Sequence, residues 1–428
     1  MSNDNEKFDA IIVGAGPAGS ACAYVLAKAG KSVLLDERGV SAGDKNVTGG
    51  RLYTYCLEMI EPGLYTRAPL QRKVVREQIM MLGKNGAMTI DYADFDFGEN
   101  IPQSYSVLRA PFDEWFASEA EEQGAMVATG ILVDELIEQD GRIVGIKAGD
   151  DEIYATVVIA ADGVNSFIAQ KAGLRQDIDA HCVGVGVKEV IELPENIIED
   201  RFTLTGDEGA ARVLLGCAGD ILGGGMLYTN KGSISLGVVL NPEDLSSRGK
   251  KIHEIMQELK MHPAIYPLIK GGNTVEYGAH LVPEVGYHAM PKNLYKDGLV
   301  IIGDAAGMVV NTGTIIRGID LAIVSGVAAA NAILKSENES NVGPAYLKEL
   351  ENLALLPTMK LYANFHKLMS NRRMVTAYPA MANEMMKVLF AVDGKVPERM
   401  NKAMLKVLKK HITIAQLLQD GWMGARAI

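Results

Sequence analysis

The stretch FDAIIVGAGPAG, residues 8–19, decides the fold. Residues 8–13 form an apolar run without polar alternation, which is typical of a buried parallel strand. The glycine-rich turn 14–19 follows, and the Ala- and Leu-rich segment 20–29 after it predicts a helix. Residues 32–35 then predict a second strand, so the chain opens with a strand, turn, helix and strand.

Three glycines of this turn have the spacing that a dinucleotide requires. Gly14 allows a tight turn, Gly16 lets the backbone approach a pyrophosphate, and Gly19 lets the helix pack on the strand. The helix N-terminus offers free N–H groups and the positive end of a dipole to the anion. An acid for the ribose hydroxyls is expected about 20 positions after the second glycine. We predict Glu37 for this role in preference to its neighbour Asp36. The turn alone does not distinguish FAD from NAD.

Two further turns after apolar strands carry acids and glycines. ADGVNS at 161–166 follows the strand expected at 156–160, and GDAAG at 303–307 follows the strand expected at 299–302. Either turn can be a simple loop. An aspartate at a strand end can also accept a hydrogen bond from a sugar-chain hydroxyl. A helix expected at 315–334 would point its positive end at an electron-rich ring.

These motifs, in this order, resemble the FAD-dependent oxidoreductases of the p-hydroxybenzoate-hydroxylase fold. The resemblance implies FAD as the cofactor. It also implies that Asp304 holds the ribitol and that the stretch 313–318 faces the pyrimidine end of the flavin. Asp162 and Gly163 would lie near the pyrophosphate or the adenosine.

More specific strings occur along the chain. They are KNVTGGRLY at 45–53, GVGVKE at 184–189, GGGMLYTN at 223–230, NTGTIIRGIDLAI at 311–323, Asp393-Gly394 and Lys409-Lys410. Together they resemble the FixC type of electron-transfer-flavoprotein:quinone oxidoreductase over essentially the whole chain. The resemblance implies an FAD relay that accepts electrons from an electron-transfer flavoprotein and passes them towards (mena)quinone. Larger relatives carry a 4Fe–4S cluster, which needs Cys thiolates. This chain has no Cys after Cys217, so a separate ferredoxin-like subunit is expected to carry one.

The motifs and the resemblance together predict a set of FAD-binding residues. They are Gly14, Gly16, Ala18, Gly19, Glu37, Arg38, Lys45, Asn46, Gly50, Arg51, Arg109, Val133, Asp162, Gly163, Gly303, Asp304, Gly313, Thr314 and Ile316. Arg51 and Arg109 can reach the FAD phosphates or the flavin edge, or be ordinary surface arginines. We assign no catalytic residue and no metal ligand. His280 and His288 fall where a quinone proton donor is possible, but an ordinary core or surface histidine is favoured there. Trp115 fits the core stripe of a helix rather than a stacking role.

Composition and element order predict an α/β protein with interleaved domains. Of the 428 residues, 48% are hydrophobic, which is ordinary for a globular chain. The net charge of −11 argues against nucleic acid as the main partner. We expect a Rossmann-like FAD-binding domain, an antiparallel-sheet substrate or quinone domain, and a helical C-terminal region. Their expected ranges are 1–75, 125–175 and 290–335 for the first, 76–124 and 176–289 for the second, and 336–428 for the third.

The segment 402–412 predicts a basic amphipathic helix, with apolar Leu405, Leu408 and Ile412 at helical spacing beside four lysines. Such a helix suits a membrane surface, a partner or plain solvent. The chain shows no signal core and no apolar run long enough to cross a bilayer. The 4 scattered Cys fit a reducing compartment. We therefore expect a cytoplasmic protein, peripheral at the inner face of the cytoplasmic membrane.

Three alternative functions stay open. The first is a prenyl reductase of the geranylgeranyl type, whose Tyr-x-Trp-x-Phe-Pro string is replaced here by MLYTN at 226–230. The second is an aromatic hydroxylase, which would need NAD(P)H and a closed aromatic pocket. The third is a flavin-bearing subunit that is active only within a complex.

Overall fold

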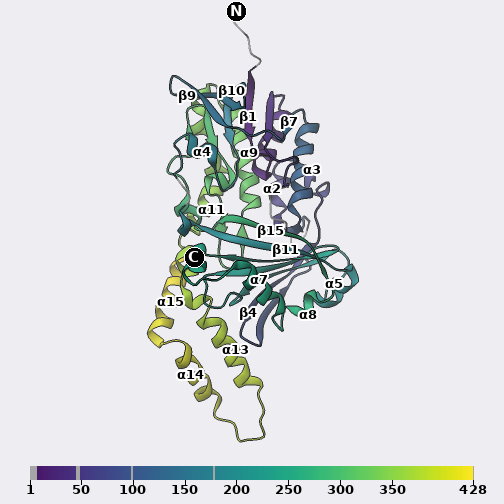
Figure 1. Cartoon of the computed structure of the whole chain (residues 1–428), viewed down its shortest axis with the longest axis vertical. Coiled ribbons are helices and arrows are strands. Elements are labelled where there is room, and N and C mark those ends of the chain that lie inside the picture. The colour runs from purple at the N-terminus through teal and green to yellow at the C-terminus, as the bar shows by residue number, and fades with distance from the viewer. Residues whose placement is uncertain (1–6, 45–48, 98–99, 177–178, 428) are drawn as a thin grey trace, which may run out of the picture.

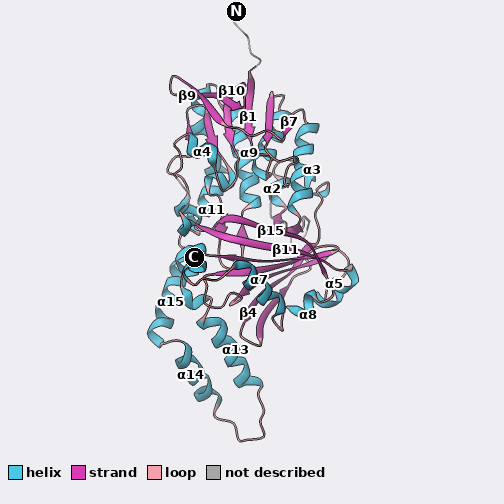
Figure 2. Ribbon diagram, in the orientation of Figure 1, coloured by secondary structure: helices cyan, strands magenta, loops and turns pink. Residues whose placement is uncertain are grey.

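Two sheets and a helical C-terminal part make up the molecule (Figures 1 and 2). The computed structural model describes residues 7–44, 49–97, 100–176 and 179–427. The first sheet lies at the top of Figure 1, the second lies below it, and the C-terminal helices lie beyond the second sheet. The fold is mixed α/β with a helical C-terminal region, as the sequence predicts.

The first sheet has a parallel core around the strand expected at the start of the chain. β1 (Phe8–Val13) lies between β2 (Val33–Glu37) and β10 (Asp151–Ala160) and is parallel to both. β17 (Leu299–Ile301) continues the sheet in parallel beyond β10, and β7 (Met126–Thr129) does so beyond β2. The carboxyl ends of these strands therefore meet at one edge, where ligands of open α/β sheets bind. The sheet is completed by antiparallel β16 (Tyr295–Lys296), β8 (Glu135–Gln139) and β9 (Arg142–Ala148).

Three helices bury the apolar strands of this sheet. α1 (Pro17–Lys28) packs against α9 (Ile319–Lys335) and α3 (Arg109–Glu122). Ile11 and Ile12 of β1 are fully buried beneath them. The helix α1 begins with a proline directly after the glycine-rich turn, where a missing N–H costs nothing.

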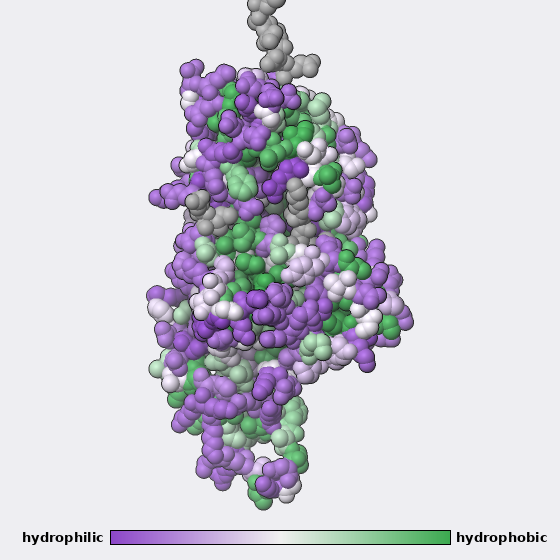
Figure 3. All heavy atoms as spheres, in the orientation of Figure 1, coloured by the Kyte–Doolittle hydropathy of each residue, from purple (hydrophilic) through white to green (hydrophobic). Residues whose placement is uncertain are grey.

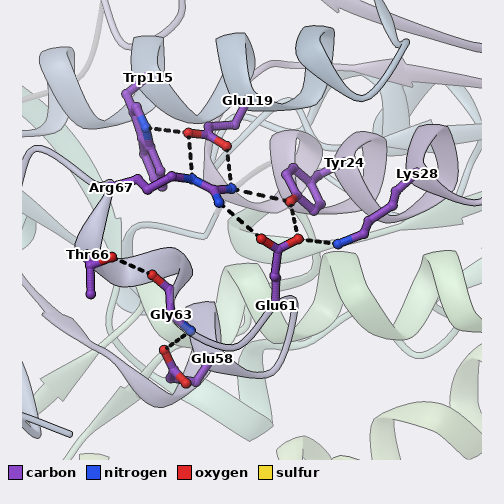
Figure 4. A network of polar contacts seen from close by, with 9 residues as sticks. All are labelled: Tyr24, Lys28, Glu58, Glu61, Gly63, Thr66, Arg67, Trp115 and Glu119. Carbon is purple, nitrogen blue, oxygen red and sulfur yellow. Dashed lines mark hydrogen bonds and ion pairs between the residues drawn. The ribbon is translucent and has the colours of Figure 1, made fainter.

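A polar network joins α1, α3 and the segment between them (Figure 4). Glu61 accepts hydrogen bonds from the Tyr24 hydroxyl, at 2.8 Å, and from the Arg67 guanidinium, at 3.0 Å. Arg67 also donates to Glu119 of α3, at 2.8 Å, and Glu119 accepts from the indole of Trp115, at 3.0 Å. Trp115 stacks on a neighbouring phenylalanine and packs against the core, so its predicted core role is confirmed.

The second sheet is mostly antiparallel and has its own core. Its strand order is β15-β11-β14-β13-β12-β4-β6-β3, with β5 paired to β4. The helices α5 (Glu195–Phe202), α7 (Ile252–Met261) and α8 (Tyr266–Ile269) contribute to the core on one face of the sheet. The strands are β3 (Gly50–Tyr53), β4 (Lys73–Leu82), β5 (Ala87–Ala93), β6 (Ser104–Val107), β11 (Val183–Glu192), β12 (Glu208–Leu215), β13 (Gly223–Thr229), β14 (Ser233–Leu240) and β15 (Asn273–Pro283).

Two predicted hairpins are confirmed, and one predicted helix begins later than expected. β4 pairs with β5 and β13 pairs with β14 across the glycine-containing turns seen in the sequence. The helix expected at 315–334 begins at Ile319, because 316–317 form β19, which pairs with β18 at 310–311. Thr314, Ile315 and Ile316 are β-branched, which favours the extended backbone of this small ribbon over a helix start.

Two elements lie elsewhere than the expected domain ranges predict. β3 belongs to the second sheet, although its residues fall within the range 1–75. Conversely, α3 packs on α1 beside the first sheet, although its residues fall within 76–124. Hydrogen-bond partners and helix packing are not readable from local patterns, so the range ends were misplaced there. The three-part division otherwise stays a proposal.

The C-terminal part is helical from residue 342 onward, with one long interruption. α13 (Ala377–Phe390) and α14 (Met400–His411) form a hairpin in which α13 contacts β4 and β5, and the far end of the hairpin extends away from both sheets (Figure 1). α15 (Ile414–Ala427) turns back and packs on α12 (Phe365–Met369). Figure 3 shows apolar residues among polar ones over this hairpin. No helix within the described ranges combines the length and the apolar composition that a membrane span requires.

Candidate functional site

A cavity of about 340 Å³ opens at the carboxyl edge of the first sheet. Most of the predicted FAD-binding residues line it: Gly14, Gly16, Ala18, Glu37, Arg38, Gly50, Arg51, Arg109, Val133, Asp162, Gly163, Asp304 and Ile316. Gly19 and Gly303 are buried directly behind its wall. Lys45 and Asn46 lie outside the described residues. The structure thus brings together residues that are up to about 300 positions apart in sequence.

A different structural reason explains why glycine stands at each of the three positions of the first turn. Gly14 has a φ of +110°, and a Cβ there would overlap the Ala161 carbonyl oxygen of the neighbouring turn. A Cβ at Gly19 would overlap the Gly14 carbonyl oxygen, so this glycine lets α1 lie close to the turn. A Cβ at Gly16 would meet no protein atom within 4 Å, although Gly16 lines the cavity. Its bare backbone therefore suits the close approach of a pyrophosphate.

The acid predicted for the ribose is held in place by backbone donors. The Glu37 carboxylate accepts from the Ala15 N–H at 3.1 Å and from the Gly39 N–H at 2.7 Å. These bonds tie the end of β2 to the glycine-rich turn beside it. Asp36 is buried, and burial, helped by the charge of Glu37, raises its pKa to about 7. Glu37 is therefore the better acceptor for ribose hydroxyls at neutral pH.

The two aspartate turns bring a buried acceptor and a buried acid to the same cavity. Asp162 accepts the Ile168 N–H through Oδ2, at 2.9 Å, while its buried Oδ1 has no partner among the described residues. Burial raises the pKa of Asp162 to about 6 and also raises the pKa of Asp304. Arg175, which sequence motifs did not reveal, donates to the Ala305 carbonyl at 2.8 Å and to Ser166 at 3.0 Å. It thereby joins the two turns.

Two basic side chains, Arg109 and Lys188, line the same cavity as these acids. Arg109 pairs with Asp113 through two bonds of 2.9 and 2.7 Å, at the start of α3. Lys188 on β11 donates from Nζ to the Gly49 carbonyl at 2.7 Å. Burial, together with the charge of Arg109, lowers the pKa of Lys188 to about 8. Sequence analysis singled out the string that contains Lys188 but gave the lysine no role. A lysine that follows five residues without a polar side chain, 183–187, was the available signal.

These features fit FAD. The cavity offers a bare backbone at a helix N-terminus for the pyrophosphate and a preset carboxylate for the ribose. It also offers an unsatisfied buried oxygen at Asp162, which a ligand donor can satisfy.

A second cavity of about 410 Å³ adjoins the first on the face of the second sheet. Apolar side chains such as Ile79, Ile90 and Val213 line it from β4, β5 and β12. Gly313 and Thr314, predicted to bind FAD, line this cavity rather than the first. The residues common to both cavities are Arg51, Met226, Tyr228, Val239, Glu284, Asn311 and Ile316.

Polar groups stand at intervals along this second cavity. Arg51 is engaged by Glu77 at 3.0 Å and donates to the Ser104 hydroxyl at 2.9 Å. Arg212 donates to the Gln78 side chain at 2.8 Å. The buried Tyr53 hydroxyl has no partner among the described residues. Sequence analysis singled out the string that ends on Tyr53 but assigned the tyrosine no role, and it did not identify Arg212, because their cavity forms only when distant strands pair.

The two histidines considered in the sequence analysis, His280 and His288, lie in different surroundings in the structure. His280 lines the first cavity, and its ring hydrogen-bonds to the Leu281 carbonyl. His288 is exposed and lies edge-on against His366, with ring centroids 5.2 Å apart. His366 lines the second cavity, and burial lowers its pKa.

Comparison with known proteins agrees with this geometry. Residues 7–198 match the FAD binding domain family, and residues 365–428 match the C-terminal domain of the ETF-QO/FixC family. The chain is 46% identical to Protein FixC of Salmonella typhi, over 100% of both chains. It is 44% identical, again over 100% of both chains, to the probable electron transfer flavoprotein-quinone oxidoreductase YdiS of Escherichia coli K12.

The same fold occurs in a solved structure of low sequence identity. The geranylgeranyl bacteriochlorophyll reductase-like protein of Thermoplasma acidophilum superimposes with a TM-score of 0.71 at 20% identity. The match covers 97% of this chain and 99% of that one. At this identity the similarity shows the fold alone.

Proposed function

This chain belongs to the ETF-QO/FixC family of FAD-dependent electron-transfer oxidoreductases, and from that premise we propose that it relays electrons from an electron-transfer flavoprotein to a menaquinone-type quinone. One observation carries the proposal: the cavity that fits FAD shares a wall with a second, larger cavity. Two redox ligands seated in adjoining cavities would be close enough for direct electron transfer.

The first cavity would hold FAD through the residues already described. Gly14, Gly16 and the N-terminus of α1 would hold the pyrophosphate, and Glu37 would accept from the ribose. Asp162 and Asp304 would accept hydroxyl or amide donors from the rest of the cofactor. The bound FAD supplies the capacity to take up and release electrons.

The second cavity would hold the quinone head and part of its isoprenoid tail. Ile79, Ile90 and Val213 supply the apolar surface that a quinone requires. The unpartnered Tyr53 hydroxyl, whose pKa burial raises to about 12, is a donor for a quinone carbonyl. Because it stays protonated at neutral pH, it can donate throughout the physiological range.

A separate ferredoxin-like subunit would carry any 4Fe–4S cluster in the complex. Cys22 and Cys56 are buried in the first domain, where burial raises the pKa of each thiol. Burial also raises the pKa of Cys217 to about 12. Cluster ligation requires thiolates, so these thiols are poor candidates. Within the described residues no group of His, Cys, Asp and Glu is arranged to hold a metal ion.

The C-terminal hairpin would rest on the membrane that contains the quinone. At its far end Phe390 is 79% exposed, and Val392 and Val396 are each 95% exposed. Lys395, Arg399 and the lysines of α14 stand near these apolar residues. Apolar side chains beside basic ones suit the interface of an anionic bilayer. On a chain of net charge −11 this local basic excess is the part that such a surface would attract.

An anaerobic stopped-flow experiment tests the relay. Purified yellow protein is mixed with reduced electron-transfer flavoprotein, and then with a short-chain menaquinone analogue, while flavin absorbance is recorded. Bleaching followed by quinone-dependent recovery is expected. Absence of bleaching, with rapid reduction by NADPH instead, would refute the relay and favour a hydroxylase or a prenyl reductase.

A further inference from the structure

Glu284 is the carboxylic acid among the residues that both cavities share. It follows the last residue of β15, and its own N–H donates to the Cys182 carbonyl at 3.1 Å. This bond fixes the backbone at the boundary between the cavities. The side chain therefore stands between the place that fits FAD and the place that fits a quinone.

The neighbouring strand leaves room for this carboxyl group. A Cβ at Gly184 of β11 would lie 2.6 Å from Cγ1 of Val239, 2.7 Å from Cδ of Glu284 and 2.8 Å from Oε1 of Glu284. The carboxyl group thus rests against bare backbone, and a side chain at 184 would displace both it and Val239. This accounts for the first glycine of GVGVKE, to which the sequence alone gave no role.

The carboxyl group of Glu284 has no hydrogen-bond or ion-pair partner within the described part of the chain. Burial is the sole cause that raises its pKa to about 7. Other titratable side chains on the surrounding elements have a bonding partner in the described ranges, except Tyr228. They are Arg51, bound to Glu77; His181, bound to Glu243; His280, bound to the Leu281 carbonyl; His366, bound to the Ala363 carbonyl; and Tyr228, whose burial raises its pKa.

Reduction of a quinone needs a proton source at this boundary. Converting a quinone to a hydroquinone consumes two electrons and two protons. We propose that Glu284 is a catalytic proton donor to the quinone, an inference that rests on the proposed function. Bound FAD would supply the two electrons, Glu284 would give one proton to a quinone oxygen, and solvent would supply the second proton. Solvent then returns the proton to the Glu284 carboxylate.

The test compares wild type with Glu284→Gln, which keeps the size of the side chain and removes the acid. Reoxidation of the reduced protein by a menaquinone analogue is expected to slow by about 100-fold, the usual contribution of a general acid. Reoxidation by ferricenium, which takes an electron and no proton, is expected to be unchanged. The wild-type quinone rate should fall as pH rises through about 7, and the variant should lack this step. Glu284→Asp should recover part of the rate.

A second readout does not use activity. The pKa of Glu284 is raised on folding, from about 4.3 in an unfolded chain to about 7. Wild type should therefore lose stability towards urea, relative to Glu284→Gln, as the pH rises from 5 to 8 in the FAD-free protein. Glu258→Gln, which removes an exposed carboxylate of α7 that lines neither cavity, serves as the control and should change neither readout.

Different results would refute the relay and the proposed role of Glu284. Wild type that is not reoxidised by quinone but is reoxidised by ferricenium would refute the relay itself. Equal quinone rates and equal pH profiles in wild type and Glu284→Gln would overturn the role of Glu284 and leave the relay intact.

Discussion

The two cavities adjoin each other but are built in opposite ways. The first is framed largely by turns that directly follow strands of the first sheet, such as residues 14–19 and 161–166, and residues of β11 and β15 of the second sheet complete it. The second is framed by strands of one sheet and by α12, which comes from the C-terminal part. A local motif preserves its geometry wherever the strand pairing holds. A cavity assembled from distant segments depends on every one of those segments being docked.

Because of this difference, substitutions are expected to act on the two cavities in different ways. A substitution that fills the first cavity without meeting protein atoms should weaken FAD binding and leave the chain folded. Substitutions far from the second cavity should still disturb it, provided that they release one of its walls. The three predictions below test this contrast, from the largest expected effect to the smallest.

The largest effect is expected from Gly16→Ala. The new Cβ meets no protein atom within 4 Å, and the backbone of Gly16 has a φ of −73°, so the fold should not change. The methyl group would instead occupy the space left for the pyrophosphate. We expect a cost of about 1 to 3 kcal/mol, which weakens FAD binding roughly 5- to 150-fold. Isothermal titration of the FAD-free protein measures it.

Gly232→Ala is the matched control, because a Cβ there also meets nothing within 4 Å and the residue lies in an exposed hairpin turn. It should bind FAD as wild type does. Equal FAD affinity in Gly16→Ala and wild type would show that the turn does not contact the cofactor.

An effect confined to the second cavity is expected from Asp420→Asn. Asp420 in α15 is buried and accepts hydrogen bonds from Arg373 at 2.7 Å, Asn371 at 2.7 Å and Tyr378 at 2.9 Å. These bonds hold α15 against the segment after α12, a wall of the second cavity. Losing the charged acceptor should cost about 1.5 to 3 kcal/mol. Limited proteolysis should then release the C-terminal helices sooner, and the quinone analogue should bind more weakly, while FAD affinity stays unchanged.

The same contact predicts a dependence on pH. Arg373 lowers the pKa of Asp420 below its ordinary value, so the stabilisation is complete above an unfolded pKa of about 3.9. It is lost as the pH falls below that value through the lowered pKa. Wild type should become protease-sensitive at the C-terminus in this acid range, whereas Asp420→Asn should be equally sensitive at pH 7 and at a pH below about 3.9. Asp393→Asn, in the exposed loop between α13 and α14, should behave like wild type.

The smallest effect on the protein itself is expected from Lys402→Gln combined with Lys409→Gln. Both lysines are exposed on α14, so the free energy of unfolding should change by less than about 0.5 kcal/mol. Each lysine near an anionic bilayer contributes about 1 kcal/mol, so partition onto phosphatidylglycerol vesicles should fall roughly 30-fold. The exposed pair Lys250→Gln and Lys251→Gln is the control. Equal loss in both pairs would mean that the hairpin is not the membrane contact.

Sequence alone predicted the first cavity far better than the second. Gly14, Glu37, Asp162 and Asp304 each follow a strand within a recognisable motif, and the structure places all four around one space. Their neighbour Arg175 was missed because it acts through backbone carbonyls, which leave no trace in side-chain patterns.

The second cavity was missed because its residues share no local pattern. Tyr53, Arg212 and His366 meet only after strand pairing and helix docking, which depend on contacts far apart along the chain. The start of α9 was misplaced for a related reason: residues 316–317 pair with 310–311 instead of continuing the helix. Local helical periodicity continues across that boundary, so periodicity alone could not show it.

The central claim is that electrons leave the first cavity for a quinone in the second. The most direct measurement is the rate at which a menaquinone analogue reoxidises the anaerobically reduced protein, in wild type and in Ile79→Trp. Ile79 lines the second cavity and not the first, so the larger side chain should fill it without altering the flavin spectrum. We predict normal reduction by electron-transfer flavoprotein and loss of quinone-dependent reoxidation in the variant. Equal reoxidation of both proteins would contradict the placement of the quinone in the second cavity.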